Sequence, residues 1–453
     1  MKVAKFGGSS LANAGQIKKV ARIIQNDPEI RYVVVSAPGK REENDIKVTD
    51  LLIDLYLAAK HNLDVQAGLE AVLNRYQAIV DELGLNPNLT QDFRAILENH
   101  LETIHDTLRL EDALKACGED FNAQLMADYL QSLGLDARYV SPAELGMMVT
   151  DEPGNAQLLP SSYEKIASFK DSDHLLVIPG FFGYSETGNI VTFPRGGSDI
   201  SGAIVARGVQ ADIYENFTDQ SYIYAAHPGI VKNPYAVKEL TYQEMRELAY
   251  SGFGIFHDEA LEPLFKVNIP VMVRNTNQPE IPGTKIVSQR HYKKELPVVG
   301  ISCDEGFTAI SIRKYLLNRQ VGFTRKLLQI FEDHGVSIEH IPTGIDDISV
   351  VVRSHYLDGV LDFIIQDIER KLQPDSLTVE DDLAILVVVG EGMVAAHGMA
   401  NKATQALADN QISIRMINQG GSEIAMFFTI HTKDKIKAIH AMYHAYFDDL
   451  VLG

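Results

Sequence analysis

The chain has 453 residues and a formal charge of −20; 45% of the residues are hydrophobic and 23% are charged, which is typical of a globular protein with two or three domains. The acidic balance argues against nucleic acid and anionic membranes as partners, and the two cysteines argue against a disulfide framework or a cysteine zinc site. No apolar run approaches the roughly 18 residues of a membrane span, and no secretion signal is recognisable, so we expect a cytoplasmic protein.

A glycine-rich turn follows the first predicted strand. Residues 2–6 read as a strand that runs into Gly7, Gly8 and Ser9, and a helix and a second buried strand come next. Backbone N–H groups of such a turn can close on a phosphate, and the ammonium group of Lys5 can reach the same anion. This stretch alone fits a phosphate site and a ligand-free tight turn equally well.

Strands and helices then alternate as far as about residue 283. The expected elements are a helical stretch over 49–117 with a break at 81–87, strands over 138–140 and 175–180, a hairpin over 181–193, a helix over 199–209, and strands over 211–214 and 269–275. This alternation predicts an α/β domain with a mostly parallel sheet that helices cover on both faces.

A second glycine cluster precedes the predicted helix over 199–209. It contains Arg195, Gly197, Ser198 and Asp199. The amides of a helix N-terminus, two glycines, a serine and an arginine together favour an anion site, and an arginine can grip a carboxylate or phosphate with two hydrogen bonds. The alternative is that Asp199 only caps the helix and Arg195 is a surface charge.

Two further acidic segments are candidates for a substrate site. Glu119 is expected at the close of the long helical stretch, where it could hold an amino group or be an exposed carboxylate at a helix start. Thr218 and Asp219 follow a predicted strand, and Tyr224 is close behind; Asp219 could orient a nucleotide or Mg²⁺, or be a turn residue. No P-loop, protein-kinase motif or zinc-protease histidine spacing is present, and we predict no metal ligand from the protein.

The last third of the chain contains an internal repeat. Residues 322–344 match residues 398–420 in register, 76 positions later, and each repeat reads strand, helix, strand, strand, helix. The first repeat has its expected second strand over 338–341. The second repeat lacks a fourth strand, and residues 298–303 can supply it, so the first repeat would be inserted in the second. Ligand sensing is favoured over simple dimerisation for these α+β modules.

The chain resembles the aspartate kinase family in four segments, which are KFGGSS at 5–10, GED at 118–120, PRGGSD at 194–199 and ENFTD at 215–219. The repeated tail resembles the paired ACT (ferredoxin-like) domains of that family's monofunctional, single-chain type. The resemblance implies an amino-acid-kinase-like sandwich, with a catalytic domain over 1–290, a first ACT domain over 307–381, and a second over 297–306 plus 382–453.

The resemblance also implies a reaction. ATP would phosphorylate the side-chain carboxylate of L-aspartate with the help of Mg²⁺, giving 4-phospho-L-aspartate, the entry to lysine, threonine, methionine and diaminopimelate biosynthesis. A different kinase of the same fold and a catalytically inactive amino-acid sensor are the alternatives. A homodimer or higher homo-oligomer through the ACT domains is expected.

Site residues are carried over from the family segment by segment. Lys5 and Asp199 would be catalytic. The phosphates and ATP would be bound by Lys5, Gly7, Gly8, Ser9, Gly197, Thr218, Asp219 and Tyr224. Aspartate would be bound by Thr49, Glu119, Arg195 and Ser198. An amino-acid effector, with lysine favoured over threonine, would be bound by Gly322, Phe323, Thr324, Ile338, Glu339 and Thr343.

Two positions depart from the family pattern. His227 precedes Pro228 where many members have aspartate, and Gly254 stands where many members have a nucleotide-contacting lysine. The missing cation would have to come from elsewhere, and Lys232 and Arg274 are the candidates.

Overall fold

The structure is a computed structural model that describes residues 1–194, 196–252, 260–291 and 296–451. The chain forms two compact units. The first unit consists of Met1–Ile223, Lys238–Gln243 and Ile255–Arg290, and the second of Tyr224–Val237, Glu244–Gly254 and His291–Gly453. Segments 224–237 and 244–254 therefore belong geometrically to the second unit, and the predicted domain boundaries stay predictions.

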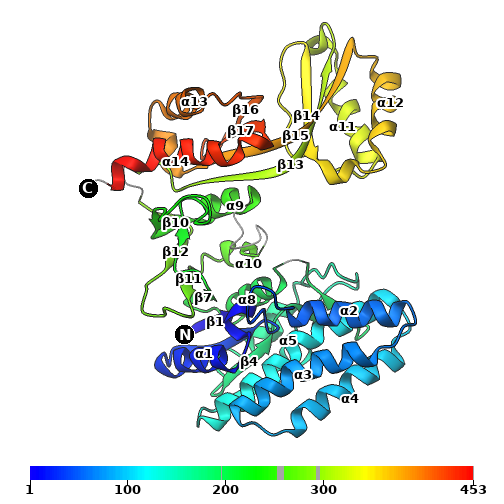
Figure 1. Ribbon diagram of the computed structural model, residues 1–453, viewed down its shortest axis with the longest axis vertical. Helices are drawn as coiled ribbons and strands as arrows, with labels where there is room; N and C mark the ends of the chain where they lie inside the picture. Colours follow the sequence, from blue (N-terminus) through cyan, green and yellow to red (C-terminus); the bar gives the residue numbers. More distant parts are fainter. Residues whose placement is uncertain (195, 253–259, 292–295, 452–453) are drawn as a thin grey trace. The chain divides into compact units, whose positions relative to one another are not determined.

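The first unit is built on an eight-stranded sheet in the order β10-β12-β11-β7-β1-β2-β4-β3 (Figure 1). Its strands are β1 (Lys2–Phe6), β2 (Ile30–Val35), β3 (Ala137–Tyr139), β4 (Leu175–Pro179), β7 (Ile213–Thr218), β10 (Glu239–Thr241), β11 (Val271–Asn275) and β12 (Thr284–Val287). All neighbours are parallel except β11 and β12. The predicted mostly parallel sheet is confirmed. The predicted hairpin is also present, as β5 (Phe182–Tyr184) and β6 (Ile190–Thr192).

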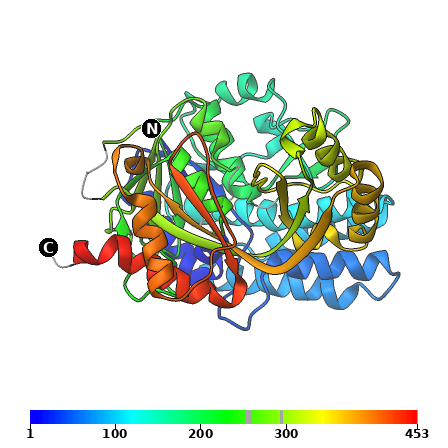
Figure 2. The same cartoon turned by 90° about the horizontal axis from the view of Figure 1, so that it is seen from above.

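Helices cover both faces of this sheet. They are α1 (Ala14–Asn26), α2 (Val48–Lys60), α3 (Gln66–Leu83), α4 (Asn88–Thr103), α5 (Thr107–Ser132), α6 (Pro142–Leu145), α7 (Ser162–Ala167), α8 (Gly197–Gly208) and α10 (Glu262–Phe265). Ala4 and Phe6 of β1 share a buried core with α1 and with α2–α5, which lie side by side in Figures 1 and 2. The helix α8 packs on the other face, where Gly202 approaches the ring of Tyr214.

Two helix boundaries differ from the sequence prediction. The long helical stretch does not close near Cys117, because α5 continues to Ser132. Apolar and small side chains cover almost the whole circumference of α5, so its pattern lacks the one-sided period that marks a helix end. The helix α8 begins at Gly197, so Asp199 lies inside its first turn and is not its N-cap.

The second unit carries a five-stranded antiparallel sheet in the order β14-β13-β15-β17-β16. Its elements are β13 (Gly300–Arg313), α11 (Phe323–Asp333), β14 (Asp347–Arg353), α12 (Leu361–Leu372), β15 (Ser376–Val389), α13 (Met399–Asp409), β16 (Met416–Gln419), β17 (Ala425–His431) and α14 (Lys435–Val451). The helix α9 (Tyr242–Tyr250) and the strand pair of β8 (Ile223–Tyr224) and β9 (Ala236–Val237) complete the regular structure between β7 and β11.

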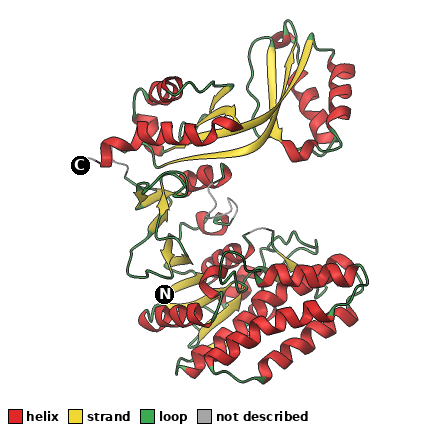
Figure 3. Cartoon of the chain, viewed as in Figure 1, coloured by secondary structure: helices red, strands yellow, loops and turns green. Residues whose placement is uncertain are grey.

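The strands β13 and β15 are each 14 residues long and run through both repeats (Figure 3). Residues 300–305 pair with 384–389, next to β17 of the second repeat, while 307–313 pair with β14 of the first. The start of β13 thus completes the sheet of the second repeat, and the predicted insertion of the first repeat in the second is confirmed.

The predicted strand over 338–341 is wrong as a regular element. Only single bridges join His340 to Val351 and Thr343 to Ile348 at the edge of β14. Pro342 lies between these bridges and has no N–H group for a continuous ladder. In the described part of the chain, no helix is both long and apolar enough to cross a bilayer.

Candidate active site

The candidate site lies at the carboxyl edge of the parallel sheet. The strands β1, β2 and β7 are neighbours and end at Phe6, Val35 and Thr218, so the loops that follow them gather at one edge. Ligands of open parallel sheets bind outside the carboxyl ends of the strands. The helix α8 begins at this same edge and presents its N-terminal turn to it, since Asp199 in that turn contacts Lys5.

The first glycine turn is held by backbone contacts. The N–H of Gly7 donates to the carbonyl of Phe217 at 3.1 Å, and the N–H of Gly39 donates to the carbonyl of Gly8 at 2.9 Å. A Cβ atom on Gly39 would lie 2.6 Å from the carbonyl carbon of Gly8. Position 39 therefore tolerates only glycine in this arrangement. Ser9 is exposed beside the turn, so its hydroxyl is open to a ligand.

Lys5, Asp199 and Asn216 form a compact charged cluster. The ammonium of Lys5 lies 2.7 Å from Oδ1 of Asp199, and the amide of Asn216 donates to the same oxygen at 2.5 Å. Lys5 and Asn216 are cross-strand partners on β1 and β7, so their side chains share a face of the sheet. Both side chains are buried, which strengthens the electrostatic interaction and fixes the position of the cation.

Glu119 is the second charged feature of the edge. It lies in the middle of α5, is only 5% exposed, and accepts a long hydrogen bond of 3.4 Å from the Ser198 hydroxyl at Oε1. Its Oε2 atom is buried without a hydrogen-bond partner among the described residues. Burial raises the pKa of Glu119 to about 7, although the nearby Ala37 amide and Ser198 hydroxyl oppose the shift. The alternative of an exposed carboxylate at a helix start is therefore wrong.

A buried carboxylate oxygen without a hydrogen-bond partner destabilises the folded protein unless a bound ligand supplies that partner. A cationic group such as a substrate ammonium would satisfy Oε2 of Glu119 and favour the charged carboxylate. The arrangement as a whole offers a fixed cation at Lys5 and an anion at Glu119, with Ser198 hydrogen-bonded to the latter. Such a pair suits a small zwitterionic substrate whose own anionic group reacts near the cation.

The other predicted site residues are placed less tightly. Thr49 is half-buried in the first turn of α2. Thr218 ends β7, and its hydroxyl donates to Oδ1 of Asp219 at 3.1 Å. Tyr224 belongs to the second unit. The predicted residues Arg195 and Gly254 lie outside the described residues.

The guanidinium of Arg274 contacts protein groups, which is not expected of a cation that binds a nucleotide. Its guanidinium lies 3.2 Å from Oε1 of buried Glu215 and donates to the carbonyl of Pro279 at 2.6 Å. Arg274 is the cross-strand partner of Phe217, one position along β7 from Asn216, so it lies on the sheet face opposite Lys5. The described contacts thus give Arg274 a structural partner, while Lys232, the other candidate, belongs to the second unit.

Sequence reasoning missed a buried clamp behind the glycine turn. The guanidinium of Arg75, on α3, forms an ion pair with Asp45 and donates to the carbonyl of Gly39 at 2.7 Å. Hydrogen bonds from Arg41, followed by those from Arg75, hold the pKa of Asp45 well below its usual range. The clamp fixes the loop that carries Gly39 against Gly8. No local pattern marks it, because its partners are distant along the chain.

A strained backbone at Phe181 was missed as well. Its φ angle is +77°, in the left-handed region that bulky side chains avoid, and its N–H is held by the Ser201 hydroxyl at 2.9 Å. A Cβ atom on Gly197 would meet the Phe181 ring at 2.6 Å, so this strained residue contacts the start of α8. Strain of this kind persists at sites where the surroundings impose it.

Replacing Arg75 with leucine should destabilise the protein by about 3–5 kcal/mol, because the partly buried carboxylate of Asp45 loses its buried partner and keeps Arg41, whose side chain is half exposed. The measurement is the free energy of unfolding in urea. Arg94→Leu is the matched control, since its pair with Glu70 is more exposed and is worth about 1 kcal/mol or less. Equal losses in the two variants would contradict the clamp.

The chain is similar to known proteins in sequence and in fold. The sequence signature described as the amino acid kinase family matches residues 1–275, and that of an ACT domain matches residues 386–446. The chain is 46% identical to aspartokinase 3 of Bacillus subtilis over 458 residues, covering 100% of each chain. It superposes on aspartate kinase of Clostridium acetobutylicum with a TM-score of 0.87 and 39% identity, covering 98% of this chain and 100% of that one.

A further solved structure shares the fold. Aspartokinase III of Escherichia coli, in complex with aspartate and ADP, superposes with a TM-score of 0.81 at 22% identity, covering 99% of this chain and 100% of that one. The family signature spans more than half of this chain, and the full-length identity to aspartokinase 3 identifies the group within that family. The chain belongs to the amino acid kinase family and, within it, to the aspartokinases.

Proposed function

We propose that the protein transfers the γ-phosphoryl group of ATP to the side-chain carboxylate of L-aspartate, giving 4-phospho-L-aspartate and ADP. This is the first step toward lysine, threonine and methionine. The observation that carries the proposal is the full-length, 46% identity to an aspartokinase, in a chain whose sheet edge holds a buried lysine and a buried, incompletely paired glutamate.

Lys5 is the proposed source of positive charge at the transferred group. A carboxylate nucleophile needs no general base, so positioning and neutralisation of phosphate charge make up most of the catalytic task. Asp199 accepts hydrogen bonds from both Lys5 and Asn216, and so holds the Lys5 ammonium near the end of β1, just before the glycine turn. The N–H group of Gly8 and the hydroxyl of Ser9 would then form a cradle for phosphate oxygens, while Gly7, whose N–H donates to the carbonyl of Phe217, would hold the turn that carries them.

Glu119 is the proposed anchor for the substrate ammonium. Its unpaired Oε2 atom and raised pKa fit a carboxylate that gains its partner only when substrate binds. Ser198, which donates to the other oxygen of Glu119, and Thr49 at the start of α2 would contact the same molecule. Arg195 remains the proposed clamp for an aspartate carboxylate on the strength of the family segment.

The nucleotide would lie beyond the carboxyl ends of β7 and β11. Thr218, Asp219 and Tyr224 are the proposed contacts, with Gly197 at the start of α8. The Asn275 amide holds the carbonyl of Asp219 at 3.1 Å and so shapes this loop. Asp199 and Asp219 are the carboxylates that could hold Mg²⁺ together with the phosphates, and the ion would supply further positive charge to the reacting group.

The ACT domains are the proposed regulatory part, with a site in the first repeat. Gly322 caps α11 with φ +80°, and the N–H group of Thr324 in the first turn of this helix would meet an effector carboxylate. Phe323 itself is buried in the core of that repeat and its N–H donates to the carbonyl of Gln320 at 3.2 Å, so it would hold the start of α11 in place beside the effector. Glu339 is half-buried and pairs with Arg353 at 3.4 Å; it is the proposed partner of an effector ammonium. Ile338 and Thr343 would flank it.

Lysine is the favoured effector, with threonine as the alternative, because carboxylates near the first repeat could meet a second ammonium. We also propose that the protein forms a homodimer through the strands of its ACT domains. An effector would regulate activity only by binding one global state more tightly than another.

The function is tested by trapping aspartyl phosphate as its hydroxamate with ATP and Mg²⁺. We expect product with aspartate and none with glutamate, and inhibition by added lysine but not by equal threonine. If neither substrate gives product while amino-acid binding is intact, the result would favour an inactive sensor. Product with glutamate or another acid in place of aspartate would favour a different kinase of the fold.

A further inference from the structure

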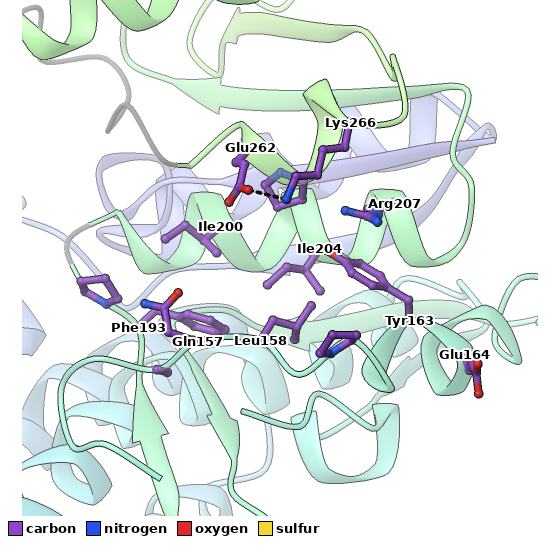
Figure 4. A pocket seen from close by; sticks show the side chains of 14 residues that line it. Gln157, Leu158, Tyr163, Glu164, Phe193, Ile200, Ile204, Arg207, Glu262 and Lys266 are labelled. Carbon is purple, nitrogen blue, oxygen red and sulfur yellow. Dashed lines mark ion pairs between the residues drawn. The ribbon is translucent and has the colours of Figure 1, made fainter. Parts of the chain in front are cut away.

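The outer face of α8 lines a hollow separate from the candidate active site. The hollow has a volume of about 540 Å³ and lies between α8, the segment 156–164 and the region of α10 (Figure 4). Neither Lys5 nor Glu119 lines it. Its volume falls within the range of about 300–1,000 Å³ that is typical of small-molecule pockets.

The hollow has an apolar side. Leu158, Phe193, Ile200, Ile204 and Pro263 contribute to it. Ile200 and Ile204 lie four residues apart on α8, so they share a face of that helix, as Figure 4 shows. This surface suits the hydrocarbon body of a ligand and offers nothing to a fully polar one.

Arg207 is the fixed cation of the hollow. Its guanidinium carbon lies 4.1 Å from the centre of the Tyr163 ring, and the two side chains are next to each other in Figure 4. Stacking on an aromatic ring holds the planar guanidinium in place. Within the described residues Arg207 has no carboxylate partner, although the chain carries a charge of −20. A guanidinium in this state is suited to a two-pronged contact with a carboxylate.

The remaining charges do not neutralise Arg207. Lys266 is paired with Glu262 at 2.5 Å on α10, and both side chains are more than half exposed, so this pair is weak. Glu164 also lines the hollow, and Figure 4 marks no ion pair between it and Arg207. A second hollow of about 500 Å³ shares Tyr163 and Arg207 as a wall and continues toward Ile269.

From these observations we propose that the hollow binds a small monocarboxylate with an apolar or aromatic body. The carboxylate would meet the guanidinium of Arg207, and the body would lie on Ile200, Ile204 and Phe193. The proposal does not rest on the kinase activity. The proposed site uses Ile200, Ile204 and Arg207 of α8, the helix whose first turn carries Ser198 and Asp199.

The test is titration calorimetry of the full-length protein with 3-phenylpropionate as the probe. We expect saturable binding that Arg207→Gln weakens at least about tenfold, since the variant loses a charge-assisted hydrogen bond to the carboxylate. Arg22→Gln on the exposed face of α1 is the matched control and should bind as the unaltered protein does. Arg207→Lys keeps the charge but loses the fork and should fall between the two.

Two further ligands separate the parts of the proposal. The alcohol 3-phenylpropanol has the same body without the carboxylate and should bind at least about tenfold more weakly. Inorganic phosphate has the charge without the body and should not compete. Binding that is unchanged in Arg207→Gln, competition by phosphate at equal concentration, or no binding of 3-phenylpropionate up to the solubility limit would each overturn the proposal. Unchanged melting temperatures of the variants show that they are folded.

Discussion

Replacing Lys5 with alanine is expected to lower kcat by about 10²–10³-fold or more while the protein keeps its fold. The ammonium of Lys5 lies 2.7 Å from Asp199 and is positioned by the buried end of β1. A preorganised cation that faces charge developing in the transition state is worth several kcal/mol, and water that enters in its place cannot reproduce a fixed charge. The measurement is steady-state formation of aspartyl hydroxamate at saturating ATP and aspartate.

Lys18→Ala is the matched control for this variant. Lys18 is exposed on α1, and its ammonium donates to the carbonyl of Glu82, so its loss should leave kcat within about twofold. Circular dichroism and the melting temperature verify that both variants are folded. A kcat near that of the unaltered protein after Lys5→Ala would remove Lys5 from the catalytic group.

Replacing Glu119 with glutamine is expected to raise KM for aspartate by about 30- to 5,000-fold, with a smaller effect on kcat. The size follows from the loss of roughly 2–5 kcal/mol when one partner of a buried charge pair is removed. Ammonium binding needs the charged carboxylate, and the pKa of Glu119 is raised to about 7 by burial. As the pH rises toward 7, KM for aspartate should therefore fall about tenfold per pH unit, and above pH 8 it should become constant. The glutamine variant should lack this slope.

The same variant should be more stable than the unaltered protein without ligand at pH 8. The pKa of Glu119 is higher in the folded chain, about 7, than its ordinary value of 4.5, so stability present below pH 4.5 is lost as the pH rises through 7. Neutral glutamine removes that loss, which is on the order of 3 kcal/mol at pH 8 and close to zero at pH 4.

Urea unfolding at the two pH values measures this difference. Asp120→Asn is a useful comparison, because the half-buried Asp120 already accepts hydrogen bonds from Tyr139 and Gln124. Removing a satisfied acceptor should destabilise rather than stabilise the protein. A destabilised Glu119→Gln variant at pH 8, or a KM for aspartate that does not change, would contradict the role of Glu119 as an anchor that waits for its cation.

Local patterns in the sequence were enough to predict the order of elements and the repeat. The strand at 2–6, the hairpin over 181–193 and the alternation of strands and helices follow from periodicity and turn residues, which act over a few positions. The inserted first repeat was predictable because one repeat lacked a strand and residues 298–303 were unassigned. Where local pattern was ambiguous, as over 338–341 before Pro342, the prediction of a regular strand was wrong.

The sequence by itself determined that Lys5 and Asp199 lie next to glycine-rich segments and that Glu119 lies in a segment shared with the aspartate kinases, and therefore that these three residues were candidates. Only the tertiary structure decided what they do to each other. Lys5 and Asp199 are 194 positions apart, and Asn216 joins them only because β1 and β7 pair in parallel. The burial of Glu119, its unpaired oxygen and its raised pKa depend on surroundings brought together by several elements, and desolvation has no signature in a local pattern.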